Sequence, residues 1–433
     1  GIFLPAPEPQ PTPKQEPKMT SASPDIPNCG GLPAAVSAFA DAFVDFAVSG
    51  IFFPTNPPPP LPATPAATFL PAPSRLVAIG DLHGDLPKSL AALRLAGLLP
   101  PANSPDSSPT STSWSAGPTL AVQLGDILDR GGDELRLLYF LRRLSISAAA
   151  QGGALLPILG NHEVMNVCGD FRFVTQPGLQ EFSSWAGWYR AGLAIKRRCG
   201  DLEPPKNPFL GVPKSYPGIR REFWDGIRSR VAALRPDGPI ARRFLADLPT
   251  VLVVGDSVFV HGGLLEANVE YGLERMNAEV SDWIRGERGD NARAPEYVCG
   301  RDAVVWLRRF SEGFNCDCDR LQGVLGMIPG AKRMVMGHTI QSEGITAVCG
   351  AQAVRVDVGL SKGCGNGLPE VLEISGGQSQ LRVITTDPAE AWMYRKQKPE
   401  KAAAALEKNG DVKDGLALLV RESHALKGVE AKA

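Results

Sequence analysis

The 433-residue sequence lacks several features that would point to particular classes of protein. No segment approaches the roughly 18 consecutive apolar residues of a membrane-spanning helix. An excess of one charge is also missing, because 45 Lys and Arg residues nearly balance 46 Asp and Glu residues and leave a net charge of -1. Such a chain has no global field that would attract nucleic acid or an anionic membrane surface. We therefore expect neither a membrane nor a nucleic acid among its partners.

Cysteine is scarce, with eight residues in the whole chain. This number is too small for a disulfide scaffold, and no Cys-x-x-Cys pair indicates a zinc cluster. Cys316 and Cys318 are too close in sequence to form an unstrained bond with each other. A bond from either one to Cys299, Cys349 or Cys364 is conceivable but cannot be read from the sequence. We expect most of the thiols to be reduced and inert.

Proline is concentrated at the start of the chain, where 18 of the 39 prolines fall within the first 73 residues. We therefore expect residues 1–72 to be a Pro-rich tail and not part of a packed core. One exception is the segment at about 32–49, where apolar residues recur at helical spacing and predict an amphipathic helix that docks on the body. Residues 387–433 are rich in Lys, Ala and Glu and are interpreted as a C-terminal tail.

Targeting signals are also missing from the first residues. No arginine precedes Arg75, which weighs against a transit peptide, and the start lacks the basic residues and apolar core of a secretory signal. These absences predict the cytoplasm as the compartment. The mitochondrial intermembrane space is the alternative, because cysteine-dependent import needs no basic presequence.

Short apolar segments alternate with segments of helical spacing between residues 73 and 386, and this alternation predicts an α/β domain. Residues 170–249 contain helical and aromatic patterns and are interpreted as a helical insertion beside the site. Strands expected at 251–254 and 257–260 are separated by Gly255-Asp256, which predicts a β-hairpin.

Side chains of metal-ligand type follow five of the predicted strands. Four of the five histidines in the chain are among them. A lone histidine at a strand end is commonly structural, but five coincidences of residue type and position are not expected by chance. The candidate metal ligands are Asp81, His83, Asp126, Asn161, His261 and His338.

The number of candidate ligands predicts two metal ions. Asp81 and His83 would hold one ion with Asp126, while the three later ligands would hold the other with the same Asp126. A shared carboxylate places two cations roughly 3.5 to 4 Å apart. Oxygen and imidazole ligands without thiolate favour Mn, Fe or Zn. Such a pair can generate a metal-bound hydroxide for direct, in-line attack at phosphorus.

Three further residues fit the same chemistry. His162 lies next to the ligand Asn161 and can protonate the leaving oxygen as a general acid, with Asp129 orienting its ring. Arg130 can hold phosphate oxygens with its planar guanidinium, and Asn161 can contribute to the same binding site. An Asp-Gly turn after a strand would explain the stretch from Asp126 to Gly131 when that stretch is taken alone.

The motifs at Gly80 to Asp85, Asp129-Arg130-Gly131 and Asn161-His162-Glu163 resemble those of the calcineurin-like metallophosphoesterases, in particular the phosphoprotein phosphatase branch. The sequence is most similar to the Shewanella-like protein phosphatases of plants. Its first motif ends in Asp85 where the eukaryotic serine/threonine phosphatases usually have Gln. The segment from Val356 to Cys364 also departs from the Ser-Ala-Pro-Asn-Tyr loop of those enzymes.

This resemblance implies a β-sandwich of two mixed sheets flanked by helices, a two-metal site, and hydrolysis of the phosphomonoesters of phosphoproteins. It also implies a second arginine that binds phosphate, for which Arg308 is the candidate and Arg301 the rival. A phosphodiesterase or nucleotide hydrolase on the same site is the alternative enzyme class. An inactive phosphatase fold that acts as a binding module is the non-enzyme alternative, and the oligomeric state cannot be read from the sequence.

Overall fold

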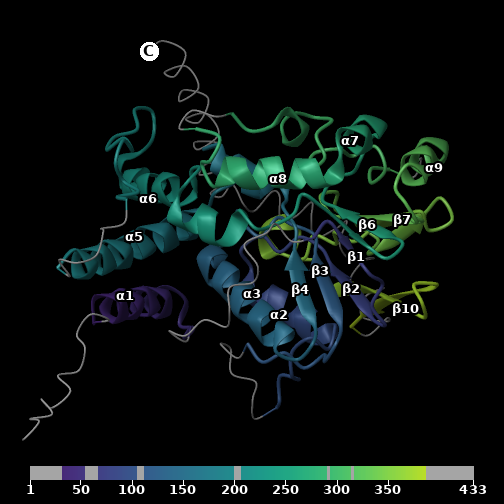
Figure 1. Cartoon of the computed structure of the whole chain (residues 1–433), viewed down its shortest axis with the longest axis horizontal. Coiled ribbons are helices and arrows are strands. Elements are labelled where there is room, and N and C mark those ends of the chain that lie inside the picture. The colour runs from purple at the N-terminus through teal and green to yellow at the C-terminus, as the bar shows by residue number, and fades with distance from the viewer. Residues whose placement is uncertain are drawn as a thin grey trace, which may run out of the picture.

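The computed structural model describes residues 32–53, 67–104, 112–198, 206–289, 293–313 and 316–386. The predicted C-terminal tail and most of the Pro-rich segment lie outside these residues. Within them, the chain forms two mixed sheets with helices on their outer faces, which confirms the predicted fold class (Figure 1).

The first sheet has five strands in the order β11-β10-β2-β3-β4. Its centre is a parallel run of β2, β3 and β4, and the hairpin of β10 and β11 adds antiparallel to β2. These strands are β2 (Leu76–Ile79), β3 (Leu120–Gln123), β4 (Ala154–Pro157), β10 (Glu370–Ser375) and β11 (Gln380–Thr385).

The second sheet has six strands in the order β1-β5-β6-β7-β9-β8, with β6, β7 and β9 parallel. Gly255, whose φ is +59°, begins the turn of the β5–β6 hairpin at the position that the sequence predicted. Edge strand β1 has only two residues and was not predicted. The six strands are β1 (Phe69–Leu70), β5 (Val251–Val254), β6 (Ser257–Val260), β7 (Arg333–Met336), β8 (Thr346–Val348) and β9 (Ala353–Arg355).

The strands of both sheets carry apolar side chains on both of their faces, and the two sheets pack together through their inner faces. Leu76 and Ala78 of β2 meet Leu252 and Val254 of β5 in a core between the sheets. The intervening residues of the same strands belong to a larger core that includes helical residues. Each fully buried Val, Leu or Ile contributes about 1.5–3 kcal/mol. Helices that contribute to that core include α2 (Leu86–Leu95), α3 (Glu134–Ala149), α8 (Leu273–Ile284) and α9 (Cys318–Gly326), and the helices between β4 and β5 add further residues.

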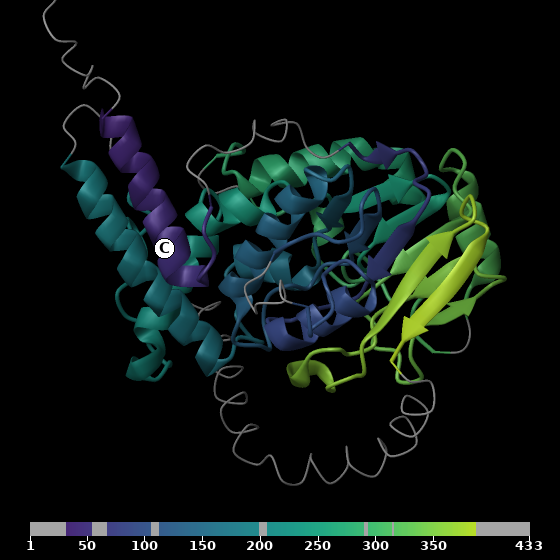
Figure 2. The ribbon, with the colours of Figure 1, turned by 90° about the horizontal axis from the view of Figure 1, so that it is seen from below.

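Helices α1 (Leu32–Ser49), α5 (Gln176–Arg197) and α6 (Trp224–Leu234) form a helical layer on one side of the sandwich, and the last two lie between β4 and β5 in the chain. Helix α1 packs along α5, as Figures 1 and 2 both show. A side chain at Gly192 of α5 would bring its Cβ to 2.8 Å from Val44 of α1, so glycine allows the two helices to approach. The chain between β4 and β5 also contains α4 (Asn161–Val167) and the short segments Arg221–Phe223 and Ala241–Leu245. Elsewhere in the described residues the short helical segments are α7 (Glu266–Tyr271), Glu296–Val298 and Lys362–Cys364.

Cys318 and Cys349 form a disulfide that joins the start of α9 to the turn after β8. These two cysteines are therefore not among the reduced thiols, whereas Cys168, Cys299, Cys316 and Cys364 remain thiols, as predicted for most of the cysteines. The sequence allowed a bond from Cys318 to Cys349 but could not select it, because the choice depends on how α9 and β8 meet in space. In the part of the chain that the structure describes, no helix has the length and apolar character needed to cross a bilayer.

Candidate metal centre

The strand directions bring the predicted ligands together. Parallel strands β2, β3 and β4 of one sheet and β6 and β7 of the other end at the same edge of the sandwich. Five of the ligands lie in the loops that follow, and Asn161 is the first residue of α4. All six side chains are buried, with 7% or less of their surface exposed. The residues that meet at this edge are Asp81, His83, Asp126, Asn161, His261 and His338.

Asp126 lies at the centre of this cluster. Its Oδ2 is 3.5 Å from His83 Nε2, and its Oδ1 is 3.2 Å from His261 Nε2. The ligand atoms of Asp126, His261 and His338 all lie within 4.8 Å of one another. Because its two oxygens face histidines from different sheets, this carboxylate is placed to bridge two cations.

Backbone carbonyls orient the three histidine rings. His83 Nδ1 donates to Leu128 O at 3.0 Å, and His261 Nδ1 donates to Leu124 O at 2.5 Å. His338 Nε2 donates to Trp306 O at 3.2 Å. A carbonyl can only accept, so each ring carries a proton on that nitrogen and turns its other nitrogen to the cluster. This arrangement is typical of histidines that bind metals.

Oxygen ligands complete the set. Asn161 Oδ1 lies 2.9 Å from His261 Nε2, and the Asp81 carboxylate accepts the backbone N–H of His338. Burial and the neighbouring Asp357 raise the pKa of Asp81, and burial and Asp126 raise the pKa of Asp357 to about 6. Crowded, buried carboxylates of this kind are stabilised by cations, so the donor set fits two metal ions. Asp357 was not among the predicted site residues.

Several site residues have left-handed backbone conformations. The φ angles are +44° at His83, +54° at Asp126, +68° at Asp129, +62° at Arg130 and +65° at His338. Each such conformation costs on the order of 1–3 kcal/mol and persists only where the surrounding structure imposes it. The strain therefore marks the loops whose geometry the site requires.

Glu163 holds two of these loops together. Its carboxylate accepts the backbone N–H groups of Asp126, Ile127, Leu128 and Gly160 at 2.8–3.0 Å. The side chain is fully buried, and burial together with Asp126 raises its pKa to about 6. Sequence reasoning quoted Glu163 as part of a motif but gave it no role. Its position directly after His162 was the available signal.

His162 and Asp129 form the predicted pair. His162 Nδ1 lies 2.6 Å from Asp129 Oδ2, and the other Asp129 oxygen accepts from Asn166 at 3.0 Å. Burial opposes a charged ring, but Asp126 and Asp129 outweigh it and raise the pKa of His162. Although burial opposes ionisation of Asp129, its hydrogen bonds to His162 and Asn166 and the charge of Arg230 lower its pKa. The ring is thus oriented by an ionised carboxylate.

Arg230 is a site residue that sequence reasoning missed. It comes from α6 in the helical insertion and is fully buried. Its Nη2 is 2.8 Å from Asp129 Oδ1 and 2.6 Å from Glu134 Oε2, and its Nε donates to Asn166 Oδ1 at 2.7 Å. The insertion therefore does more than border the site, because it supplies the cation that holds Asp129.

The three candidate arginines occupy different positions. Arg130 lies over the ring of Phe173, 4.6 Å from its centroid, and that ring is 5.0 Å from the His162 ring. Arg308 Nη1 donates to His338 O at 3.1 Å, which places it against a candidate ligand. Arg301 lines the same cavity as Arg308, and no contact between Arg301 and the ligands is found among the described residues. The geometry favours Arg308 over Arg301 beside the metal centre.

Comparison with known proteins gives consistent results. Residues 74–341 match the family described as calcineurin-like phosphoesterase. The chain is 50% identical over 407 residues to Shewanella-like protein phosphatase 2 of Arabidopsis thaliana, covering 94% of this chain and 97% of that protein. It is 25% identical over 297 residues to Shewanella-like protein phosphatase 1 of Plasmodium berghei, covering 66% and 67%. A solved structure of a cold-active protein-tyrosine phosphatase from a psychrophilic Shewanella species covers 74% of this chain and 83% of its own, with 17% identity and a TM-score of 0.49.

Proposed function

Because the chain belongs to the calcineurin-like phosphoesterases, and within them to the Shewanella-like protein phosphatases, we propose that it is a metal-dependent enzyme that hydrolyses the phosphomonoesters of phosphoproteins. The observation that carries this proposal is the position of Asp126, whose two oxygens face His83 and His261 from opposite sheets. When bound, two cations lower the pKa of a water toward about 7 and so supply the nucleophile.

The ligand types indicate how the cations would be held. Asp81, His83 and Asp126 would bind one ion, and Asp126 with the remaining three would bind the other. The donors are oxygen and imidazole nitrogen without thiolate, so we propose Mn, Fe or Zn as the metals. The remaining ligands are Asn161, His261 and His338.

The side chains around the metals have separate tasks in this mechanism. His162 donates a proton from Nε2 to the leaving oxygen, because its Nδ1 is engaged by Asp129. Arg130 and Arg308 bind the phosphoryl oxygens, and Asn161 contributes its amide to the same group. The stacking of Arg130 on Phe173 fixes the plane of its guanidinium before substrate arrives.

Metal analysis and kinetics on the same variants test this proposal. We expect Asp126→Asn to lose both metals and nearly all activity, because its carboxylate faces both ligand sets, whereas His261→Ala should lose mainly one metal. Near-zero metal in purified wild-type protein would contradict the two-metal assignment. A phosphopeptide, bis-nitrophenyl phosphate and a dinucleotide polyphosphate should be assayed side by side. A preference for bis-nitrophenyl phosphate would indicate a phosphodiesterase, and a preference for the dinucleotide polyphosphate would indicate a nucleotide hydrolase. Either result would contradict the proposed phosphatase activity.

A further inference from the structure

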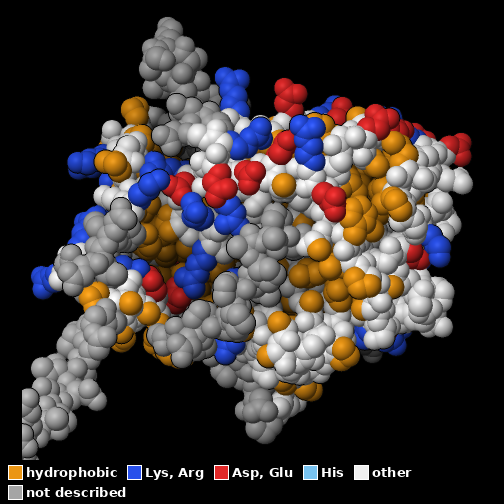
Figure 3. All heavy atoms as spheres, viewed as in Figure 1, with side chains coloured by type: hydrophobic (Ala, Val, Ile, Leu, Met, Phe, Trp, Pro, Cys, Tyr) orange, Lys and Arg blue, Asp and Glu red, His pale blue; other side chains and the backbone are white. Residues whose placement is uncertain are grey.

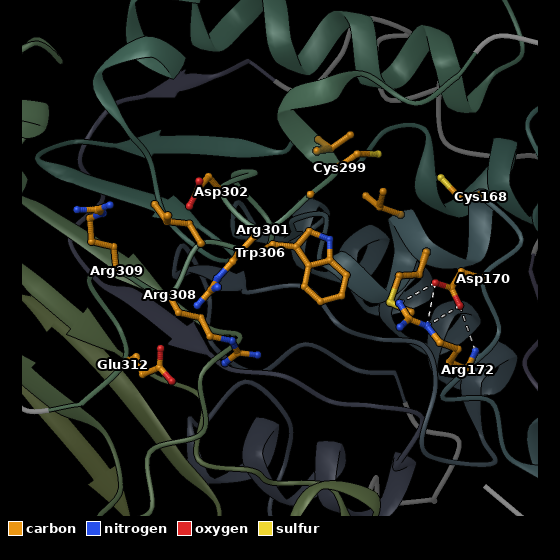
Figure 4. A pocket seen from close by; sticks show the side chains of 15 residues that line it. Cys168, Asp170, Arg172, Cys299, Arg301, Asp302, Trp306, Arg308, Arg309 and Glu312 are labelled. Atoms are coloured by element: carbon orange, nitrogen blue, oxygen red, sulfur yellow. Dashed lines mark hydrogen bonds and ion pairs between the residues drawn. The ribbon is translucent and has the colours of Figure 1, made fainter. Parts of the chain in front are cut away.

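A cavity of about 980 Å³ lies directly beside the metal centre. One wall is formed by α4 and the residues after it, and the other by residues 298–312 (Figure 4). Three lining residues contact candidate metal ligands. Met165 Sδ is 3.8 Å from Asn161 Nδ2, Trp306 O is 3.2 Å from His338 Nε2, and Arg308 donates to His338 O. The cavity is therefore continuous with the place where a phosphoryl group would bind.

The volume of this cavity exceeds what one phosphoryl group needs. Sites for small molecules have volumes of roughly 300–1,000 Å³, and this cavity lies at the upper end of that range. If the phosphorylated side chain occupies the metal centre, residues next to it in the substrate would lie in the cavity. The lining therefore selects substrates by the chemistry of those neighbouring residues.

The lining combines apolar side chains with arginines. Val164, Met165 and Val298 are buried apolar residues, and Trp306 presents its indole in the middle of the cavity in Figure 4. The charged residues of the lining are four arginines and three acidic residues, so their net charge is positive. These residues are Arg172, Arg301, Arg308, Arg309, Asp170, Asp302 and Glu312.

The arginines differ in their partners. Arg172 is neutralised by Asp170, whose carboxylate it contacts at 2.8–3.0 Å. Arg309 lies 3.9 Å from Asp317. Among the described residues, no ion pair forms with Arg301 or Arg308, and Arg301 is exposed. In Figure 4, Arg301 and Arg308 lie on one side of Trp306, while the Arg172–Asp170 pair stands on the other.

We propose that the cavity binds an acidic group of the substrate, a carboxylate or a second phosphate close to the phosphorylated residue, and that Arg301 is the side chain that recognises it. Arg308 is engaged with the hydrolysed phosphoryl group, which leaves Arg301 as a lining arginine for which no ion pair is found in the described part of the chain. The neutral Arg172–Asp170 pair and the apolar residues shape the rest of the cavity. This inference rests on the proposed phosphatase function, since it concerns the sequence around the phosphorylated residue.

The test uses the full chain and phosphoserine peptides that differ in one residue. That residue is Gln, Glu, Lys or phosphoserine, placed at each of three positions on either side of the hydrolysed phosphoserine. We expect kcat/KM of the wild type to be about five- to tenfold higher for the Glu or phosphoserine peptide than for the Gln peptide at one or more positions. Arg301→Gln should bring this ratio close to one, and Arg301→Glu should make the Lys peptide the preferred substrate at the same position.

Two arginine variants serve as controls. Arg309→Gln removes the same charge from the same wall, so a loss of preference equal to that of Arg301→Gln would show a general field effect and overturn the assignment. Arg275→Gln removes an exposed arginine that pairs with Glu279 on α8, and its activity and preference should equal those of the wild type. Equal kcat/KM of the wild type for the Gln, Glu, Lys and phosphoserine peptides at every position would also overturn the inference.

A binding measurement separates this inference from the proposed function. The same peptides with a non-hydrolysable phosphonate in place of the phosphoester can be titrated by calorimetry. If the wild type hydrolyses no phosphopeptide, the phosphatase function fails. Tighter binding of the acidic phosphonate peptides, if Arg301→Gln abolishes it, would still support the binding of an acidic group in the cavity. Hydrolysis without any acidic preference, in kinetics and in binding, would leave the phosphatase intact and refute the role of Arg301.

Discussion

The 2.6 Å contact between His162 Nδ1 and Asp129 Oδ2 decides which ring nitrogen can reach the leaving group. If Nε2 donates a proton, its contribution should grow with the pKa of the leaving group. A serine alkoxide leaves poorly, whereas a tyrosine phenolate, with a pKa of about 10, leaves more easily. We expect His162→Asn to lose about 10²- to 10⁴-fold on phosphoserine, less on phosphotyrosine and least on nitrophenyl phosphate.

The kinetic comparison needs a metal measurement on the same protein, because the backbone N–H of His162 donates to Asp126. The expected result includes unchanged metal content. Asp129→Asn should show the same order of losses more weakly, since Asp129 acts only through the ring, which it orients and whose pKa it raises. Equal losses on the three substrates would mean that His162 positions phosphate or water and donates no proton.

Arg230 leads to a prediction about both stability and rate. Arg230→Met would leave Asp129 and Glu134 buried without their cation, and breaking a buried pair in this way costs about 3–5 kcal/mol. Because Asp129 would lose its fixed position, kcat should fall while KM changes little. Chemical unfolding and steady-state kinetics measure the two effects, and Arg230→Lys, which keeps the charge, should recover part of each. Unchanged kcat in a stable Arg230→Met protein would limit Arg230 to a structural role.

The metal ligands could be predicted from the sequence because each follows an apolar strand, and parallel strands in a sheet bring their carboxyl ends to one edge. The roles of Glu163 and Arg230 could not be predicted in this way. Arg230 is 101 residues from Asp129 and reaches it only because α6 folds back over the site. The positive φ angles at His83 and Asp126 are likewise imposed by tertiary contacts, and nothing in the residue types requires them.

At the scale of elements, helix α1 shows how a segment next to a Pro-rich stretch is fastened to the body. The apolar spacing predicted this helix, but the sequence could not show its anchor. Asp45 accepts two hydrogen bonds from Arg243 at 2.6 and 2.7 Å, and Arg243 stacks on Phe53, Tyr139 and Phe244. A bidentate pair with one buried partner is stronger than a surface ion pair.

We expect Asp45→Asn to lower the free energy of unfolding by about 1–3 kcal/mol and to increase proteolysis near α1. The matched control is Asp41→Asn on the same helix. Asp41 pairs with Lys196 at 2.6 Å but has 59% of its side chain exposed, so its loss should cost only about 0–1 kcal/mol. Limited proteolysis and urea unfolding provide the measurements. Equal effects of the two variants would show that α1 is held by apolar packing alone.

For the whole molecule, Lys and Arg are mixed with Asp and Glu over the face seen in Figure 3, in keeping with a net charge of -1. The charge pattern therefore does not indicate a compartment, and the Cys318–Cys349 bond bears on this question only through the oxidising conditions in which such bonds persist. Disulfides are rare in the cytosol. The sequence predicted the cytoplasm, with the mitochondrial intermembrane space as the alternative, and of these two we propose that the bond favours the alternative; imaging of a fusion that begins at Met19 tests the choice.

The same bond gives a prediction for the stability of the whole chain. It closes a loop with a sequence separation of 31 residues, and restricting such a loop in the unfolded chain contributes roughly 2–5 kcal/mol. We expect the free energy of unfolding, measured in urea, to fall by similar amounts in the double variant Cys318→Ser with Cys349→Ser and in the reduced wild type. Cys364→Ser, which changes a thiol outside the bond, is the control. The bond joins α9 to the turn after β8 and involves none of the candidate ligands, so the metal content of the double variant should equal that of the wild type. A double variant as stable as the oxidised wild type would contradict a stabilising role for the bond.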